Sequence, residues 1–267
     1  MIGAIIGDIV GSRFEFNNHL SKEFDFFHPN CEFTDDTVMT CAVAQALMDC
    51  KPDYSDLSEK TVEAMQRIGR QFPDCGYGAR FYHWMFSDNP QPNNSCGNGA
   101  AMRISPVGFV ARDVEEAKKL SAAVTCISHN HPQGMKGAEA TAVAIVMARQ
   151  GKSKEEIRAA MEEYYDLSIS VEKYRRLWKG HGREICQESL PQALTCFFEG
   201  ESFEDVIRNC ISIGGDSDTI AAIAGGIAEA FYGVPEKYQI KAERFLPPVL
   251  VQIVLDFRQK LNKDSAL

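Results

Sequence analysis

The apolar residues of this chain recur at helical spacing almost throughout its length. From Thr37, the apolar positions 38, 39, 42, 43, 46 and 47 share one face of a helix. The segment 138–151 is apolar on nearly every side, which is typical of a buried helix, and Gly151 ends it. Alternating runs of the kind that form strands are almost absent. The pattern therefore predicts an all-α fold.

Further helices are expected toward the C-terminus. Ser153 and Glu156 have the spacing of a capping box at the start of one helix. Gly200 ends another helix that begins near residue 189, and apolar periodicity predicts three more in 202–215, 219–232 and 247–261. No linker-like segment interrupts the chain, and 267 residues can bury about three quarters of the unfolded surface. We expect one domain over residues 1–267.

The charge and the cysteines exclude several classes of function. The chain has 28 basic and 37 acidic residues, a net charge of −9, and no run of more than two Lys or Arg. This composition argues against non-specific nucleic-acid binding and against anionic membranes. No apolar run approaches the roughly 20 residues of a membrane span, and the apolar start has no basic flank of a signal peptide. Nine scattered cysteines without CxxC spacing indicate reduced thiols, so we expect a cytoplasmic protein.

Two acidic clusters stand at the starts of predicted helices. Thr-Asp-Asp-Thr occupies 34–37, and Gly-Gly-Asp-Ser-Asp-Thr occupies 214–219. Such residues can simply cap a helix, because their oxygens accept from its free N–H groups and suit its positive end. One cap residue is enough for a helix, however, and each cluster holds two carboxylates beside a threonine. The alternative is a site for a hard cation such as Mg²⁺, which prefers oxygen ligands.

If the two clusters converge, their carboxylates need a counter-charge. Asp35, Asp36, Asp216 and Asp218 could not all stay ionised in one cleft without it. Two divalent cations bridged by one carboxylate would supply the charge and would lower the pKa of a bound water. Glu15, which follows a glycine-bearing segment at 7–11, is a candidate fifth carboxylate.

Two further segments are candidates for ligand contacts. Gly97-Asn98-Gly99 offers backbone N–H groups just before a helix, which suits a phosphate, although a tight turn explains it equally well. His129 and His131 are poorly spaced for joint metal binding on a helix. They could contact a ligand, but capping of the helix that follows is favoured from the residues alone.

Together these segments resemble a known family. The chain carries, in this order, FTDDTVMT, NGAAMRISPVG, SHNHPQG, CQESLPQAL and GGDSDTIAAIAGGIAEAFYG. This order is similar to that of ADP-ribosylglycohydrolases, and the match runs from Ile2 to about Gly233. The resemblance implies a compact orthogonal multi-helix fold around a cleft with two Mg²⁺ or Mn²⁺ ions. It also implies cleavage of the N- or O-glycosidic bond that joins ADP-ribose to a protein side chain.

The resemblance also implies roles for individual residues. The metal ligands would be Thr34, Asp35, Asp36, Asp216, Asp218 and Thr219. Glu15 matches the family's acidic residue after the GDxxG segment, and Asp74 resembles an acidic residue with an acid/base role in bacterial members. The diphosphate would bind Gly97, Asn98 and Gly99, and His131 would line the cleft. The segment 172–182 matches no family motif and is a candidate for setting acceptor preference.

The mechanism implied is attack of a metal-oriented water on the anomeric carbon. Asp36 or Glu15 would accept the proton of that water, and a general acid would protonate the departing side chain. The favoured substrate is ADP-ribosylarginine in a modified protein. Two alternatives stay open: hydrolysis of a small ADP-ribose conjugate or modified nucleobase, and a non-catalytic ADP-ribose-binding or structural role. The intact set of acidic and threonine ligands argues against the last. We expect a monomer, with the small-residue helix at 220–232 packed in the core.

Overall fold

Helices make up nearly all of the regular structure. The computed structural model describes residues 1–178, 180 and 182–264. In order, the elements are α1 (Ile2–Gly11), the 3-10 turn η1 (Ser12–Phe14), α2 (Asp35–Asp49), α3 (Leu57–Gly69), α4 (Ala79–Phe86), α5 (Gly99–Met102), α6 (Ser105–Val110), α7 (Val114–Thr125), α8 (Pro132–Arg149), α9 (Lys154–Glu162), α10 (Val171–Leu177), α11 (Cys186–Glu199), α12 (Phe203–Ser212), α13 (Ser217–Tyr232), α14 (Glu236–Glu243) and α15 (Pro248–Asp264). The described residues contain no strand, only an isolated bridge between Gly97 and Ile185. The all-α prediction is confirmed.

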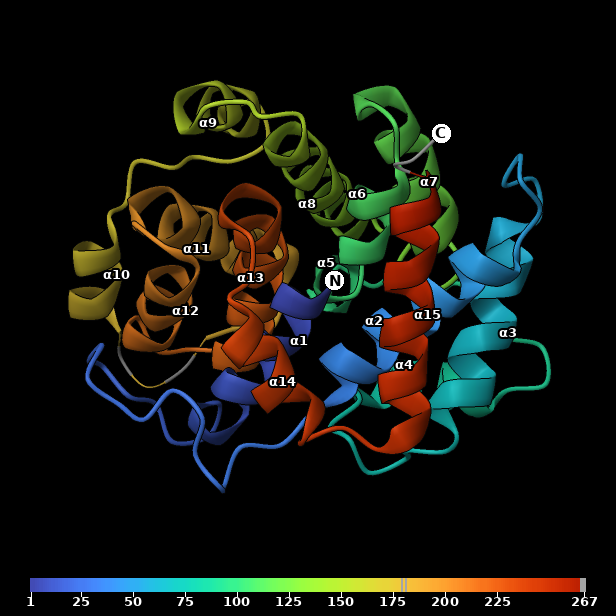
Figure 1. Ribbon diagram of the computed structural model, residues 1–267, viewed down its shortest axis with the longest axis horizontal. Helices are drawn as coiled ribbons and strands as arrows, with labels where there is room; N and C mark the ends of the chain where they lie inside the picture. Colours follow the sequence, from blue (N-terminus) through green and yellow to red (C-terminus); the bar gives the residue numbers. More distant parts are fainter. Residues whose placement is uncertain (179, 181, 265–267) are drawn as a thin grey trace.

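Helices α1 and α13 form the centre of the molecule. Every residue of α1 is buried, and α13 packs against α1, α8, α11 and α12 (Figure 1). Small residues allow the close approach: a Cβ on Gly7 would lie 2.1 Å from the carbonyl oxygen of Ala221, and one on Gly225 would lie 2.3 Å from that of Gly3. The two backbones therefore touch, which places polar residues of α1 beside the start of α13.

The remaining helices surround this pair. Helices α2, α3 and α15 lie on one side of α1 in Figure 1, and α10, α11 and α12 lie on the other. Helix α8 is largely buried and packs against α6, α7 and α13; it lies above α1 in Figure 1. None of the helices in the described ranges combines the length and apolarity that crossing a lipid bilayer requires.

Local predictions are confirmed at several helix ends. Ser153 and Glu156 form the complete capping box of α9, and Gly200 is the C-cap of α11. All nine cysteines are free thiols. Helices α2, α8 and α13 begin two to six residues before the predicted positions, because their first turns are built from polar or small residues that apolar periodicity does not detect.

Candidate active site

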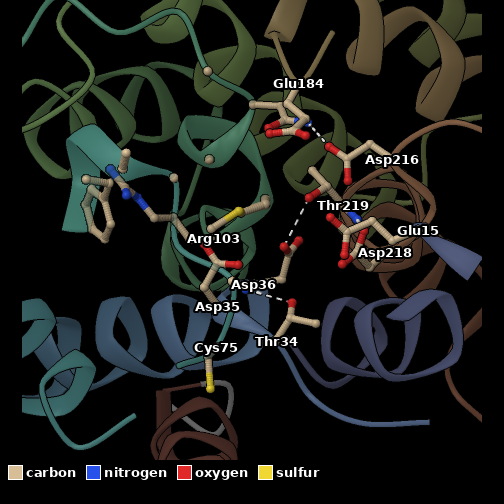
Figure 2. Close-up of a pocket in the computed structure, with 18 of the residues that line it drawn as sticks. Glu15, Thr34, Asp35, Asp36, Cys75, Arg103, Glu184, Asp216, Asp218 and Thr219 are labelled. Carbon is tan, nitrogen blue, oxygen red and sulfur yellow. Dashed lines mark hydrogen bonds between the residues drawn. The ribbon is translucent and has the colours of Figure 1, made fainter. Parts of the chain in front are cut away.

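A cavity of about 610 Å³ opens where the N-termini of α2 and α13 meet the start of α5. Nearly all of the site residues expected from sequence line it, although they come from segments spread over 200 positions. These residues are Glu15, Thr34, Asp35, Asp36, Asp74, Gly97, Asn98, Gly99, Asp216, Asp218 and Thr219. The two acidic clusters therefore converge in space (Figure 2).

The carboxylates form two groups that share one member. Oxygens of Asp8, Asp36 and Asp218 lie within 4.8 Å of one another, and so do oxygens of Glu15, Asp216 and Asp218. Asp218 could therefore contribute a ligand to a cation held by either group. Asp35 lines the same cavity but belongs to neither group.

Asp8 is a site residue that the sequence analysis missed. It is fully buried on α1 and accepts hydrogen bonds from the backbone N–H groups of Thr34 (2.9 Å) and Thr37 (3.0 Å) and from the Thr34 hydroxyl (2.7 Å). Asp8 therefore fastens the first turn of α2 to α1. The available signal was an acidic residue within an apolar helix, because such a residue is rarely buried without a partner.

Asp36 is buried in surroundings that disfavour its negative charge. Its side chain is 3% exposed, its Oδ2 accepts from the hydroxyl of Thr219 at 3.0 Å, and its Oδ1 has no hydrogen-bond partner. Burial, followed by the charge of Asp8, raises the pKa of Asp36 well above its usual range. Burial likewise raises the pKa of Asp35 and of Asp218. The carboxylates of the cluster raise one another's pKa, and this set of oxygen ligands fits a hard divalent cation.

Three acidic residues, Glu15, Glu184 and Asp216, lie together at the rim of the cavity. Burial, together with the charges of Asp216 and Glu184, raises the pKa of Glu15 to about 7. Burial and Asp216 also raise the pKa of Glu184. Sequence reasoning missed Glu184, because the bridge between Gly97 and Ile185 carries it to the cavity and no local motif marks it.

The Gly97-Asn98-Gly99 turn was expected to offer free backbone N–H groups to a phosphate, but most of them are hydrogen-bonded within the protein. The N–H of Gly97 donates to Ser95 Oγ, and the N–H of Asn98 donates to the carbonyl of Glu184. The Asn98 side-chain amide donates to Asp216 Oδ2 (2.5 Å) and to Ser189 Oγ (2.9 Å). Asn98 therefore orients a carboxylate, and most N–H groups expected to face a phosphate are already bonded.

The two histidines lie in different surroundings. His131 is not among the residues that line the cavity; its Nδ1 accepts from the N–H of Gln133 and caps α8. His129 is 5% exposed and lines the cavity instead. The family-based expectation named His131, because spacing alone does not say which ring faces the cavity.

A second, smaller cavity of about 260 Å³ adjoins the first. The two share Glu15, Phe16, Glu184 and Asp216, and the smaller one is also lined by Trp178. Trp178 belongs to the segment 172–182, which sequence analysis linked to acceptor preference. Lys179 and His181 of that segment lie outside the described residues.

The fold and site together define a helical enzyme with a carboxylate-lined cleft large enough for a nucleotide-sized substrate. The family model described as ADP-ribosylglycohydrolase matches residues 1–261, and the chain belongs to this family. It is an ADP-ribosyl hydrolase, an enzyme that cleaves a glycosidic bond.

Named relatives cover almost the whole chain. ADP-ribosylhydrolase ARH3 from Homo sapiens is 27% identical over 92% of this chain and 88% of its own length. The ADP-ribosyl-[dinitrogen reductase] glycohydrolase of Rhodospirillum rubrum is 25% identical over 91% of this chain and 90% of its own. A solved structure titled ADP-ribosylglycohydrolase-related protein complex has a TM-score of 0.70 and 21% identity, covering 91% of this chain and 93% of that one. At that identity the likeness concerns the fold.

Proposed function

We propose that the enzyme depends on two divalent cations, Mg²⁺ or Mn²⁺, and releases ADP-ribose from ADP-ribosylarginine in modified proteins. The observation that carries the proposal is the pair of carboxylate groups joined by Asp218, of which the first is wholly buried. The first cation would be held by Asp8, Asp36 and Asp218, and the second by Glu15, Asp216 and Asp218. Thr34, Asp35 and Thr219 complete the oxygen-rich surroundings. When bound, such cations lower the pKa of a water and orient it against the substrate.

Separate residues are proposed to accept the proton of the water and to protonate the leaving nitrogen. Glu15 lies at the half-exposed rim shared by both cavities, so it can reach a water on one side and the acceptor on the other. The water oxygen bonds to the anomeric carbon and gives up a proton to Glu15 or Asp36. The bond from that carbon to the arginine nitrogen breaks, and this nitrogen takes up a proton. Asp74 lines the larger cavity and is our candidate for the acid that supplies it.

The rim supports arginine as the acceptor. Glu15, Glu184 and Asp216 face the smaller cavity, where Trp178 and Phe16 add aromatic surface. A guanidinium pairs with carboxylates through its planar fork and stacks on aromatic rings, whereas a serine hydroxyl needs neither contact. Nine free cysteines support a cytoplasmic location, where thiols stay reduced. The residues proposed to hold the cations and to transfer protons come together within a single chain, and we propose that the monomer is active.

The test is release of free ADP-ribose from matched peptides that carry ADP-ribosylarginine or ADP-ribosylserine. We expect release from the arginine peptide with Mg²⁺ or Mn²⁺ and none after EDTA treatment. Asp36→Asn should abolish release, whereas Asp88→Asn, on an exposed loop, should not. Release from the serine peptide alone would refute the arginine assignment. Binding of ADP-ribose without release from either peptide would instead indicate a small conjugate as substrate or a binding role.

A further inference from the structure

Arg103 is a buried arginine for which the proposed chemistry has no use. It follows α5 directly, it is 0% exposed, and one side of it reaches the wall of the larger cavity. Its guanidinium packs 5.1 Å from the centre of the Phe81 ring. Figure 2 shows it pointing away from the carboxylates of Asp36 and Asp218. Charge balance of the acidic cluster is therefore not its main role.

The hydrogen bonds of Arg103 converge on one imidazole. Its Nη2 donates to Ser128 Oγ at 2.7 Å and lies 3.3 Å from Nδ1 of His129, while Ser128 Oγ lies 2.9 Å from the same Nδ1. A guanidinium can only donate, and the serine oxygen already accepts from it, so the serine hydrogen is free to point at the ring. Nδ1 of His129 thus faces donors on both sides and must be the unprotonated nitrogen. The hydrogen of the neutral ring is then on Nε2.

The other ring nitrogen faces the glycine turn. Nε2 of His129 lies 3.4 Å from the position a Cβ on Gly99 would occupy and 3.6 Å from that of Gly97. The N–H groups of Gly97 and Asn98 are already bonded within the protein. Few backbone donors of the turn are thus left for an anionic group, and Nε2–H of His129 is placed to add one.

We infer that Arg103 is a positioning residue that holds neutral His129 in the Nε2–H tautomer, so that the ring donates a hydrogen bond to a phosphate oxygen bound at Gly97–Gly99. The inference rests on the proposed function for the identity of that phosphate, which belongs to the diphosphate of ADP-ribose. Burial, and after it the charge of Arg103, lowers the pKa of His129 well below its usual range, in agreement with a neutral ring. The Arg103 pKa falls only to about 10, so its charge persists at neutral pH.

The first experiment needs no substrate and no variant of Arg103. Nitrogen NMR of histidine-labelled protein reports which ring nitrogen is protonated, and loss of one signal set in His129→Gln assigns the resonances. We expect unprotonated Nδ1 and protonated Nε2 at neutral pH. An Nδ1–H tautomer or a doubly protonated ring would overturn the inference.

The second experiment links the tautomer to the ligand. Arg103→Met removes the donor at similar size, and Arg103→Lys keeps a buried cationic donor. We expect Arg103→Met to lose the single tautomer and to bind ADP-ribose about tenfold to a hundredfold more weakly, as loss of a charge-assisted hydrogen bond predicts. Arg103→Lys should restore part of both, and the exposed Arg112→Met should change neither. Unchanged binding by a folded Arg103→Met would contradict the inference.

Two ligands separate this inference from the proposed function. If ADP-ribose fails to bind the wild-type enzyme but inorganic pyrophosphate shifts the His129 Nε2 resonance, the proposed substrate is wrong and the phosphate donor stands. If ADP-ribose binds and the resonance stays unchanged, the substrate stands and the donor role of His129 is refuted. A folding defect in Arg103→Met leaves the wild-type resonance shift as the deciding measurement.

Discussion

At the scale of single residues, Asp36 combines two opposed demands. Its carboxylate is buried beside other carboxylates, which disfavours its charge, yet one of its oxygens is left without a hydrogen-bond donor. A residue selected for stability alone would be neutral here. We therefore expect Asp36→Asn to raise the melting temperature of the metal-free protein by a few degrees, equivalent to about 1 kcal/mol. The same variant should lose at least about a hundredfold in activity.

Thermal unfolding and peptide hydrolysis, measured on the same preparations, check this prediction. Asp88→Asn is the control, because its carboxylate is exposed on a loop. A metal-free Asp36→Asn that melts well below the wild type would show that the carboxylate is structural rather than held for a cation.

The raised pKa values also set the pH range in which a cation stabilises the fold. Burial raises the pKa of Asp8 from 3.8 to about 6 and that of Glu15 from 4.5 to about 7. The folded state binds these two protons more tightly than the unfolded state does. The stabilisation that the protonated carboxyl groups give the fold is therefore complete below about pH 4 and is lost as the pH rises through 6 and 7. Cation binding needs the deprotonated carboxylates. We expect Mg²⁺ or Mn²⁺ to raise the melting temperature strongly at pH 8 and little at pH 5, and an equal rise at both would contradict this site.

At the scale of helices, sequence periodicity predicted α2, α8, α9, α11, α12, α13 and α15, but it predicted no range for others such as α3 and α7, and it did not find all of the site. The acidic clusters at the starts of α2 and α13 were predicted because each holds two carboxylates, which is one more than a helix cap needs. Asp8 was missed because its partners Thr34 and Thr37 lie 26 and 29 residues away. Glu184 was missed because its position depends on an isolated bridge between distant segments. Only the folded chain shows that His129, rather than His131, turns toward the cleft.

The contact between α1 and α13 sets the distance between Asp8 and Asp218. A Cβ on Gly7 would come within 2.1 Å of the carbonyl oxygen of Ala221, so the two helices must separate if Gly7 becomes alanine. We expect Gly7→Ala to lower the free energy of unfolding by about 3 kcal/mol and to weaken cation binding. Denaturant titration and metal titration measure the two effects.

Gly78→Ala is the matched control, because nothing lies within 4 Å of its added Cβ and its backbone has φ −56°. It should change stability by less than about 1 kcal/mol. A Gly7→Ala protein as stable as this control would mean that α1 and α13 can separate without cost.

At the scale of the whole molecule, the site joins segments from both ends of the chain. Asp8 and Asp36 come from α1 and α2, whereas Asp216 and Asp218 stand at the start of α13 (Figure 1). The protein carries a net charge of −9, so it repels an anionic substrate at long range. The proposed binding of a diphosphate would then depend on local groups: the proposed cations, hydrogen-bond donors such as His129, and the polar wall of the cavity.

Removal of the cations should therefore loosen one connected part of the molecule. Without counter-charge, the carboxylates repel one another where α1, α2 and α13 meet. Helices α7 and α9 pack against other helices, chiefly α8, and carry none of these carboxylates. We expect EDTA to speed amide hydrogen exchange in residues 34–40 and 214–220 together and to leave α7 and α9 unchanged. Asp36→Asn, which should no longer hold the first cation, should show a smaller response to EDTA. Faster exchange spread evenly over all helices would instead mean that the cations stabilise the fold as a whole, and no change anywhere would mean that the cluster binds none.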